Sequence, residues 1–163
     1  MRKKLGFTLI ELVVTVAIVG VLASVAMPML QLSAQRVKEN ELRENLRLIR
    51  AAIDAYKKDV DEGRIQKSIE QTGYPPNLEI LVHGVEDVKD PNKHKLRYLR
   101  RIPLDPMRPV DDGNNKAEGR LPSNWGLRSY ASEAENPAEG DDVYDVYSRS
   151  KQTGINGVPY DQW

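Results

Sequence analysis

The feature that most constrains this chain is a long apolar run, residues 7–32, which reads FTLIELVVTVAIVGVLASVAMPMLQL and holds one charged residue, Glu11. A helix of about 20 mostly apolar residues crosses a bilayer, so the run is long enough to span one. Arg2, Lys3 and Lys4 precede it. Because cationic flanks stay on the cytoplasmic side of a membrane, we predict one spanning helix, with the N-terminus inside the cell and the remaining chain outside.

Two ordinary interpretations of the run leave Glu11 unexplained. The run could be a secretory signal peptide with a small-residue site at 24–26, Ser-Val-Ala. It could also be a simple single-pass anchor. An acidic residue within a membrane helix costs about 2.5–3.5 kcal/mol at the centre and less near the ends, so it usually marks a function.

A third interpretation gives Glu11 a role. Residues 4–11, KLGFTLIE, resemble the recognition sequence of type IV pilins and type II secretion pseudopilins. The resemblance implies that a dedicated peptidase cuts after Gly6 on the cytoplasmic side and methylates the new terminus at Phe7. Glu11 then takes the place of that family's acidic residue near the mature terminus.

The resemblance also implies how subunits would be aligned. The new amine at Phe7 stays cationic after methylation, and a cation and a carboxylate that are each costly in low dielectric offset one another when paired. We therefore expect Phe7 of one subunit to pair with Glu11 of a neighbour and to set the axial register. Removal of Glu11 should then abolish filament assembly.

Two helix-weakening residues lie further along the run. Pro28 removes one backbone hydrogen bond and costs about 3 kcal/mol, and Gly20 costs about 1 kcal/mol. These costs predict a kink in the isolated subunit. The resemblance implies local melting of 20–28 when subunits assemble.

Beyond the apolar run, the sequence predicts that the helix continues. Glu39 with Arg43 and Asp54 with Lys58 are opposite charges four residues apart, expected on an exposed surface. We predict one helix over 8–62, roughly 80 Å long at 1.5 Å per residue. A two-stranded coiled coil is the alternative to packing under a small head. One apolar stripe follows helical spacing: Leu42, Leu46, Ile49, Ile53, Tyr56 and Val60.

The last hundred or so residues alternate apolar stretches with turn signals, which predicts a small α+β head. Asn77 is placed to cap a short helix that ends at Val82. Asn156-Gly157 is a hairpin-turn signal. The other expected elements are a short one over 95–102, strands over 125–132 and 143–148, and polar surface loops over 110–124 and 133–142.

Sequence motifs in the head resemble, more specifically, those of the major, G-type pseudopilin of type II secretion systems. Pilins of surface pili more often close this region with a disulfide, and this chain has no cysteine. The motifs that carry the likeness occur in order: Gly73-Tyr74-Pro75, Tyr98-Leu99, Ile102-Pro103-Leu104-Asp105-Pro106, Trp125-Gly126, Tyr144-Asp145-Val146-Tyr147-Ser148 and Trp163.

One departure from that family concerns calcium, which the G-type family commonly binds in a loop after the last strand through a Ser-x-Gly-x-Asp pattern. Here residues 148–152 read SRSKQ, so Gln152 stands where Asp is expected. The basic residues of this loop oppose a cation, and we expect hydrogen bonds and the Asn156-Gly157 turn to hold it instead. The remaining weak calcium candidates, which lack an EF-hand spacing, are Asp105, Asp111, Asp112, Ser148 and Glu118.

The chain carries no nucleotide-binding, zinc-protease or serine-hydrolase motif. His83 and His94 lie on different expected elements, and Asp141-Asp142 beside Asp145 fits a surface loop better than an acid–base pair. Equal numbers of acidic and basic residues, 24 of each, give no indication of a nucleic-acid partner. We expect neither catalysis nor a required cofactor.

These observations predict a pilin-like lollipop with four segments. They are a cleaved cationic leader (1–6), a transmembrane and polymerisation helix (7–30), an amphipathic helix that continues into the head (31–62), and a periplasmic globular head (63–163) with a small antiparallel sheet.

The expected function is structural. Subunits would leave the inner membrane and polymerise into a periplasmic pseudopilus that drives protein export across the outer membrane. Expected partners are further copies of the chain, minor pseudopilins, the prepilin peptidase and methyltransferase, the lipid bilayer, and an inner-membrane platform with a separate ATPase. The alternatives are a type IV pilin for adhesion, motility or DNA uptake, and an exported periplasmic binding module that starts near Met27.

Overall fold

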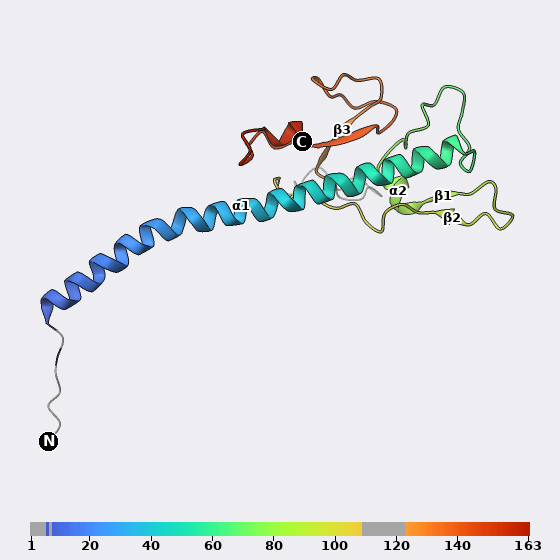
Figure 1. Ribbon diagram of the computed structural model, residues 1–163. Coiled ribbons are helices and arrows are strands. Elements are labelled where there is room, and N and C mark those ends of the chain that lie inside the picture. Colours follow the sequence, from blue (N-terminus) through green and yellow to red (C-terminus); the bar gives the residue numbers. More distant parts are fainter. Residues whose placement is uncertain (1–5, 7, 109–122) are drawn as a thin grey trace. The chain divides into compact units, whose positions relative to one another are not determined.

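The computed structural model describes residue 6 and residues 8–108 and 123–163. The chain divides into two compact units, 1–37 and 38–163, and the long helix α1 contributes to both (Figure 1). The elements of the described residues are α1 (Leu9–Asp61), α2 (Glu79–His83), β1 (Val85–Glu86), β2 (Lys95–Leu96), β3 (Trp125–Arg128), β4 (Asp145–Ser148) and the 3-10 turn η1 (Tyr160–Gln162).

Helix α1 confirms the predicted single helix to within one residue at each end. At its start, Thr8 Oγ1 accepts a hydrogen bond from the Glu11 amide at 3.3 Å. At its end, Gly63 adopts a φ of 72°, in the left-handed region that glycine enters without strain. The 53 residues of α1 include positions 20 and 28, where the backbone is also helical.

The N-terminal unit exposes its apolar side chains. An 18-residue window of α1 has a mean hydropathy of 2.5, and none of it is buried. The hydroxyls of Thr15 and Ser24 donate to the carbonyl oxygens of Leu12 and Val21, at 2.9 and 2.7 Å. These polar groups are therefore satisfied within the helix, as an apolar environment requires.

The second unit buries the predicted stripe of α1. All six stripe residues are buried within this unit, so its own side chains cover the face that a coiled coil would need. The residues that form the rest of the core are Ala52, Ile65, Leu78, Leu81, Leu99, Ile102, Trp125, Val143, Val146 and Tyr160.

Two short antiparallel sheets complete this unit, β1 with β2 and β3 with β4. In the second sheet Trp125 pairs with Ser148 and Arg128 with Asp145. Asn77 does cap the short helix, because its Oδ1 accepts from the Ile80 amide at 3.0 Å.

Several predicted elements are shorter in the structure. The predicted element over 95–102 is a strand only at β2. The predicted strand over 125–132 ends at Arg128, because the chain turns at 130–131, where the Ser132 amide donates to Ser129 O at 3.1 Å. The strand expected from 143 begins at Asp145. The expected loop over 110–124 lies, up to 122, outside the described residues.

The prediction of an exposed Glu39 was wrong. Its residue surface is 3% exposed, although Arg43 still approaches it at 3.8 Å. The structure pairs Lys58 with Glu62, at 3.8 Å, in place of the predicted Asp54. The predicted turn at Asn156-Gly157 is confirmed, with Gly157 at a φ of 80° and the Gly154 amide donating to Val158 O at 2.9 Å.

Candidate functional site

The predicted processing site lies next to the start of α1. Gly6 is exposed and outside any helix, and α1 begins at Leu9. Phe7, the predicted new terminus, lies outside the described residues. The cut after Gly6 remains a prediction. The exposed position of Gly6 is compatible with access by a peptidase.

Glu11 lies in the first turn of α1, with its side chain exposed. Thr8 and Glu11 have the spacing of a capping box, in which a threonine oxygen accepts from the amide three residues later. The positive end of the helix dipole also favours a carboxylate there. The spacing and the helix dipole therefore favour a carboxylate at position 11, which the sequence argument missed, and the pairing of Glu11 with Phe7 stays a prediction.

Gly20 and Pro28 lie within α1, whose backbone is helical at both positions. A Cβ added at Gly20 would meet nothing within 4 Å. Contacts inside the subunit therefore do not require glycine at this position. The predicted loosening of 20–28 on assembly remains a prediction.

The exposed apolar residues of α1 between Leu9 and Leu32 form what we call the apolar assembly surface. It covers all sides of the helix in this unit, and a surface of this kind requires lipid or protein around it. Its large members are Leu9, Ile10, Leu12, Val13, Val14, Val16, Ile18, Val19, Val21, Leu22, Met29, Leu30 and Leu32.

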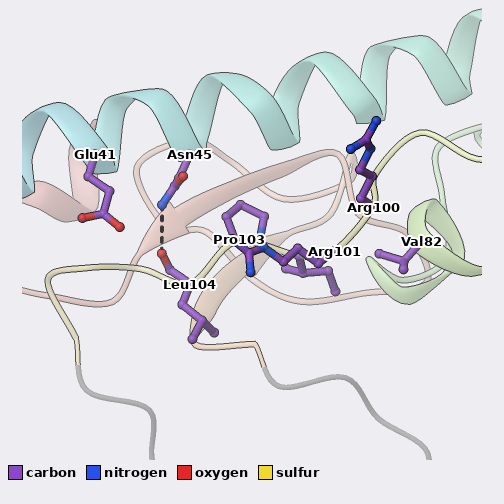
Figure 2. A pocket seen from close by; sticks show the side chains of 8 residues that line it. Glu41, Asn45, Val82, Arg100, Arg101, Pro103 and Leu104 are labelled. Atoms are coloured by element: carbon purple, nitrogen blue, oxygen red, sulfur yellow. Dashed lines mark hydrogen bonds between the residues drawn. The ribbon is translucent and has the colours of Figure 1, made fainter.

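A cavity of about 550 Å³ opens in the second unit between α1 and the segment 100–104 (Figure 2). Asn45 is one of its lining residues, and its Nδ2 donates to Leu104 O at 3.0 Å. The charged lining residues are Glu41, Arg100 and Arg101. The lining residues include no serine, threonine, lysine or histidine, so this cavity does not combine a nucleophile with a base.

The structure brings together two of the weak calcium candidates, Asp105 and Ser148, and both are buried. Ser148 Oγ donates to Asp105 Oδ2 at 2.6 Å, and Asp105 Oδ1 accepts from the Met107 amide at 2.8 Å. Asn124 Oδ1 accepts from the Asp105 amide at 2.7 Å. Both carboxylate oxygens of Asp105 therefore serve internal hydrogen bonds. Asp111, Asp112 and Glu118 lie outside the described residues.

Side chains of the loop after β4 make contacts within the protein. Arg149 pairs with Glu139 at 2.6 Å, and the Ser150 amide donates to Ser148 Oγ at 3.1 Å. Asp161 Oδ1 is buried without a hydrogen-bond partner. Calcium takes six to eight oxygen ligands, whereas the described residues contain no group of three or more acidic, histidine or cysteine side chains that could hold a metal ion. The absence of calcium from this loop stays a prediction.

An ion-pair network joins the end of α1 to the β1–β2 hairpin. Arg64 donates to Asp87 Oδ2 at 2.6 Å and to Asp59 Oδ1 at 3.1 Å. The Arg64 hydrogen bond holds the pKa of the Asp87 carboxyl below its ordinary value. Burial, together with the hydrogen bond from Tyr98 Oη to Asp59, raises the pKa of Tyr98.

Two residues of α1 that sequence reasoning did not single out as functional hold the end of the chain. Glu39 contacts Ile155 and Tyr160, and Arg50 contacts Asp145 and Trp163. The sequence did contain a signal for Glu39, which lies three residues before Leu42 and seven before Leu46. That spacing places it on the buried stripe.

Comparison with known proteins supports the predicted processing site at the N-terminus. Residues 1–27 match the profile of the prokaryotic N-terminal methylation motif. No solved structure matches the chain significantly.

Curated relatives match a longer stretch. The chain is 33% identical over 109 residues to the type II secretion system core protein G of Pseudomonas aeruginosa, covering 64% of this chain and 69% of that protein. The proteins of the same name from Vibrio cholerae and Escherichia coli are each 31% identical, covering 65% and 64% of this chain and 67% of each relative. This chain therefore belongs to the family of the type II secretion system core protein G, the major pseudopilin.

Proposed function

We propose that this chain is a structural subunit of a type II secretion pseudopilus, which polymerises in the periplasm and drives protein export across the outer membrane. The observation that carries the proposal is the apolar assembly surface, a helical span of mean hydropathy 2.5 with none of it buried in the subunit. Such a helix is stable in a bilayer before assembly and between the helices of other subunits afterwards.

Processing would convert the membrane precursor into the polymerising form. The methylation motif over 1–27 supports cleavage after Gly6 and methylation at Phe7 by a prepilin peptidase and methyltransferase. The precursor would be anchored in the inner membrane by one span. Arg2, Lys3 and Lys4 would keep the N-terminus in the cytoplasm, with the second unit in the periplasm.

Assembly would use three features of α1. The apolar assembly surface packs subunit against subunit, and Glu11 pairs with the amine at Phe7 of a neighbour to set the register. Loosening between Gly20 and Pro28 lets the helix extend as subunits leave the membrane. Minor pseudopilins and an inner-membrane platform with its own ATPase are the further partners that we propose.

The test is the intact mass and N-terminal peptide of the protein from its own cells. We expect a mature form that starts at N-methylated Phe7 and retains the apolar helix. A start near Met27, or an uncut Met1, would contradict the assembly proposal. Deletion of the gene should also abolish protein secretion, whereas lost surface pili with intact secretion would point to a pilus subunit instead.

A further inference from the structure

We infer that the C-terminal segment, residues 149–163, is fastened to α1 by Glu39 and Arg50, and that this fastening replaces the calcium that the family resemblance implies for the loop after β4. The inference concerns how the second unit is stabilised and does not depend on polymerisation. It rests on hydrogen bonds between residues more than a hundred positions apart in the sequence.

Glu39 supplies the first attachment. Its Oε1 accepts from the Ile155 amide at 2.8 Å and from Tyr160 Oη at 2.9 Å. Glu39, Tyr160 and the apolar stripe are buried together. The carboxylate oxygen of Glu39 therefore satisfies one backbone donor and one side-chain donor of the C-terminal segment.

Arg50 supplies the second attachment, about three turns further along the same helix. Its Nη2 donates to the backbone oxygen of Trp163 at 2.8 Å and to Val146 O at 3.2 Å. Its Nε donates to Asp145 Oδ1 at 2.7 Å. One guanidinium therefore joins β4 to the last residue of the segment, and the planar fork of arginine suits such multiple contacts.

Arg43 lies between these two attachments. Its guanidinium stacks over the Trp163 ring at 4.3 Å, and Trp163 in turn packs edge-on against Tyr160 at 5.1 Å between ring centroids. Cation–π stacking of this kind is favourable at partly exposed sites. The three helix residues therefore contact Ile155, Tyr160 and Trp163 of the C-terminal segment.

The segment also closes on itself through its backbone. Thr153 and Pro159 form an antiparallel bridge, and Asn156 Oδ1 accepts from the Val158 amide at 3.1 Å. The Tyr160 amide donates to Gln152 O at 3.0 Å. Gln152 stands where the family's pattern has an acidic residue, and its backbone carbonyl oxygen accepts this hydrogen bond.

The charges of the loop agree with this arrangement. Lys151 precedes Gln152, and a positive charge next to this position disfavours a bound divalent cation, whereas the charge of Arg149 is paired with Glu139. Asp161 Oδ1 is a lone buried oxygen without a partner within the described part of the chain. A single unpartnered carboxylate oxygen falls far short of the six to eight oxygen ligands that calcium takes.

The experiment is thermal unfolding of the full chain in detergent micelles, in excess EGTA and in millimolar calcium. We expect the same midpoint in both conditions. Glu39→Ala, which leaves buried donors of Ile155 and Tyr160 without their acceptor, is expected to lower the midpoint by about 4–8 °C. Glu44→Ala removes an exposed carboxylate from the same helix and is expected to leave the midpoint unchanged.

A midpoint that rises with calcium in the unmodified chain would overturn the replacement of calcium, whether or not the variants fold. Limited trypsin digestion tests the fastening separately. Cleavage after Lys151, measured by mass spectrometry, is expected to be several-fold faster in Glu39→Ala and in Arg50→Gln than in Glu44→Ala. Equal rates in all three variants would overturn the role of Glu39 and Arg50.

Discussion

Gly126 of β3 lies opposite Tyr147 of β4, and the tyrosine ring fills the space that a side chain at position 126 would occupy. A Cβ at Gly126 would lie 2.3 Å from Tyr147 Cζ. Glycine is therefore required here by the close approach of a ring. The contact also fixes the face of the small β3–β4 sheet on which Tyr147 packs.

Gly126→Ala should destabilise the second unit, because the ring of Tyr147 has to move. We expect a loss of about 1–3 kcal/mol in the free energy of unfolding, as for other overpacked sites. Urea denaturation followed by circular dichroism measures it. The control is Tyr147→Ser: in that background the added methyl should be tolerated, and an equal loss there would show that the ring is not the cause.

Ile53→Ala tests the buried stripe of α1. Ile53 is 1% exposed in the core of the second unit, and truncation of such a residue costs about 2–5 kcal/mol through lost burial and a residual cavity. Leu48 lies on the same helix and is 48% exposed. Leu48→Ala should change the free energy of unfolding by much less, and equal losses for the two variants would contradict the assignment of the buried face.

Helix α1 was predictable because periodicity is a local signal. The stripe through Leu42 and Val60 identified the buried face, and Gly63 marked the stop. Glu39 was misplaced because its charge was paired with Arg43 on the helix surface, while its equally clear place on the apolar stripe was given no weight. The charge of Glu39 predicted an exposed residue and its spacing predicted a buried one, and the spacing was right.

The contacts of the second unit were less accessible to sequence reasoning. The partners of Glu39, Ile155 and Tyr160, lie more than a hundred residues away, so no local pattern indicates them. The strand expected over 125–132 was too long because Tyr130 is a strand-favouring residue, whereas Ser129 and Ser132 form a hydrogen-bonded turn. Tertiary contacts set these boundaries.

The Arg64–Asp87 pair should make stability depend on acid pH. The hydrogen bond from Arg64 lowers the pKa of Asp87 in the folded state below its ordinary value of 3.8. A group with a lowered folded pKa contributes stability above the unfolded value and loses it as pH falls through the folded value. The contribution of Asp87 is therefore expected to be complete at pH 6 and to disappear below 3.8.

Asp87→Asn provides the measurement. Denaturation at a series of pH values is expected to show the variant less stable than the unmodified chain at pH 6, with the gap narrowing as pH falls below 3.8. Glu70→Gln, which changes an exposed carboxylate, should track the unmodified chain at every pH. If the difference in free energy of unfolding between Asp87→Asn and the unmodified chain stays constant with pH, the ion pair does not control the acid response.

Glu11→Gln separates the two roles of Glu11. Glutamine also serves at this position of a capping box, so the start of α1 should survive while the carboxylate that pairs with the Phe7 amine is lost. We expect normal membrane insertion and cleavage after Gly6, with little or no assembled filament, because an unpaired ammonium in an apolar interface is costly. The readouts are intact mass and the amount of filament sheared from producing cells. Glu44→Gln should assemble normally, and wild-type amounts of filament from Glu11→Gln would show that the register does not depend on this charge.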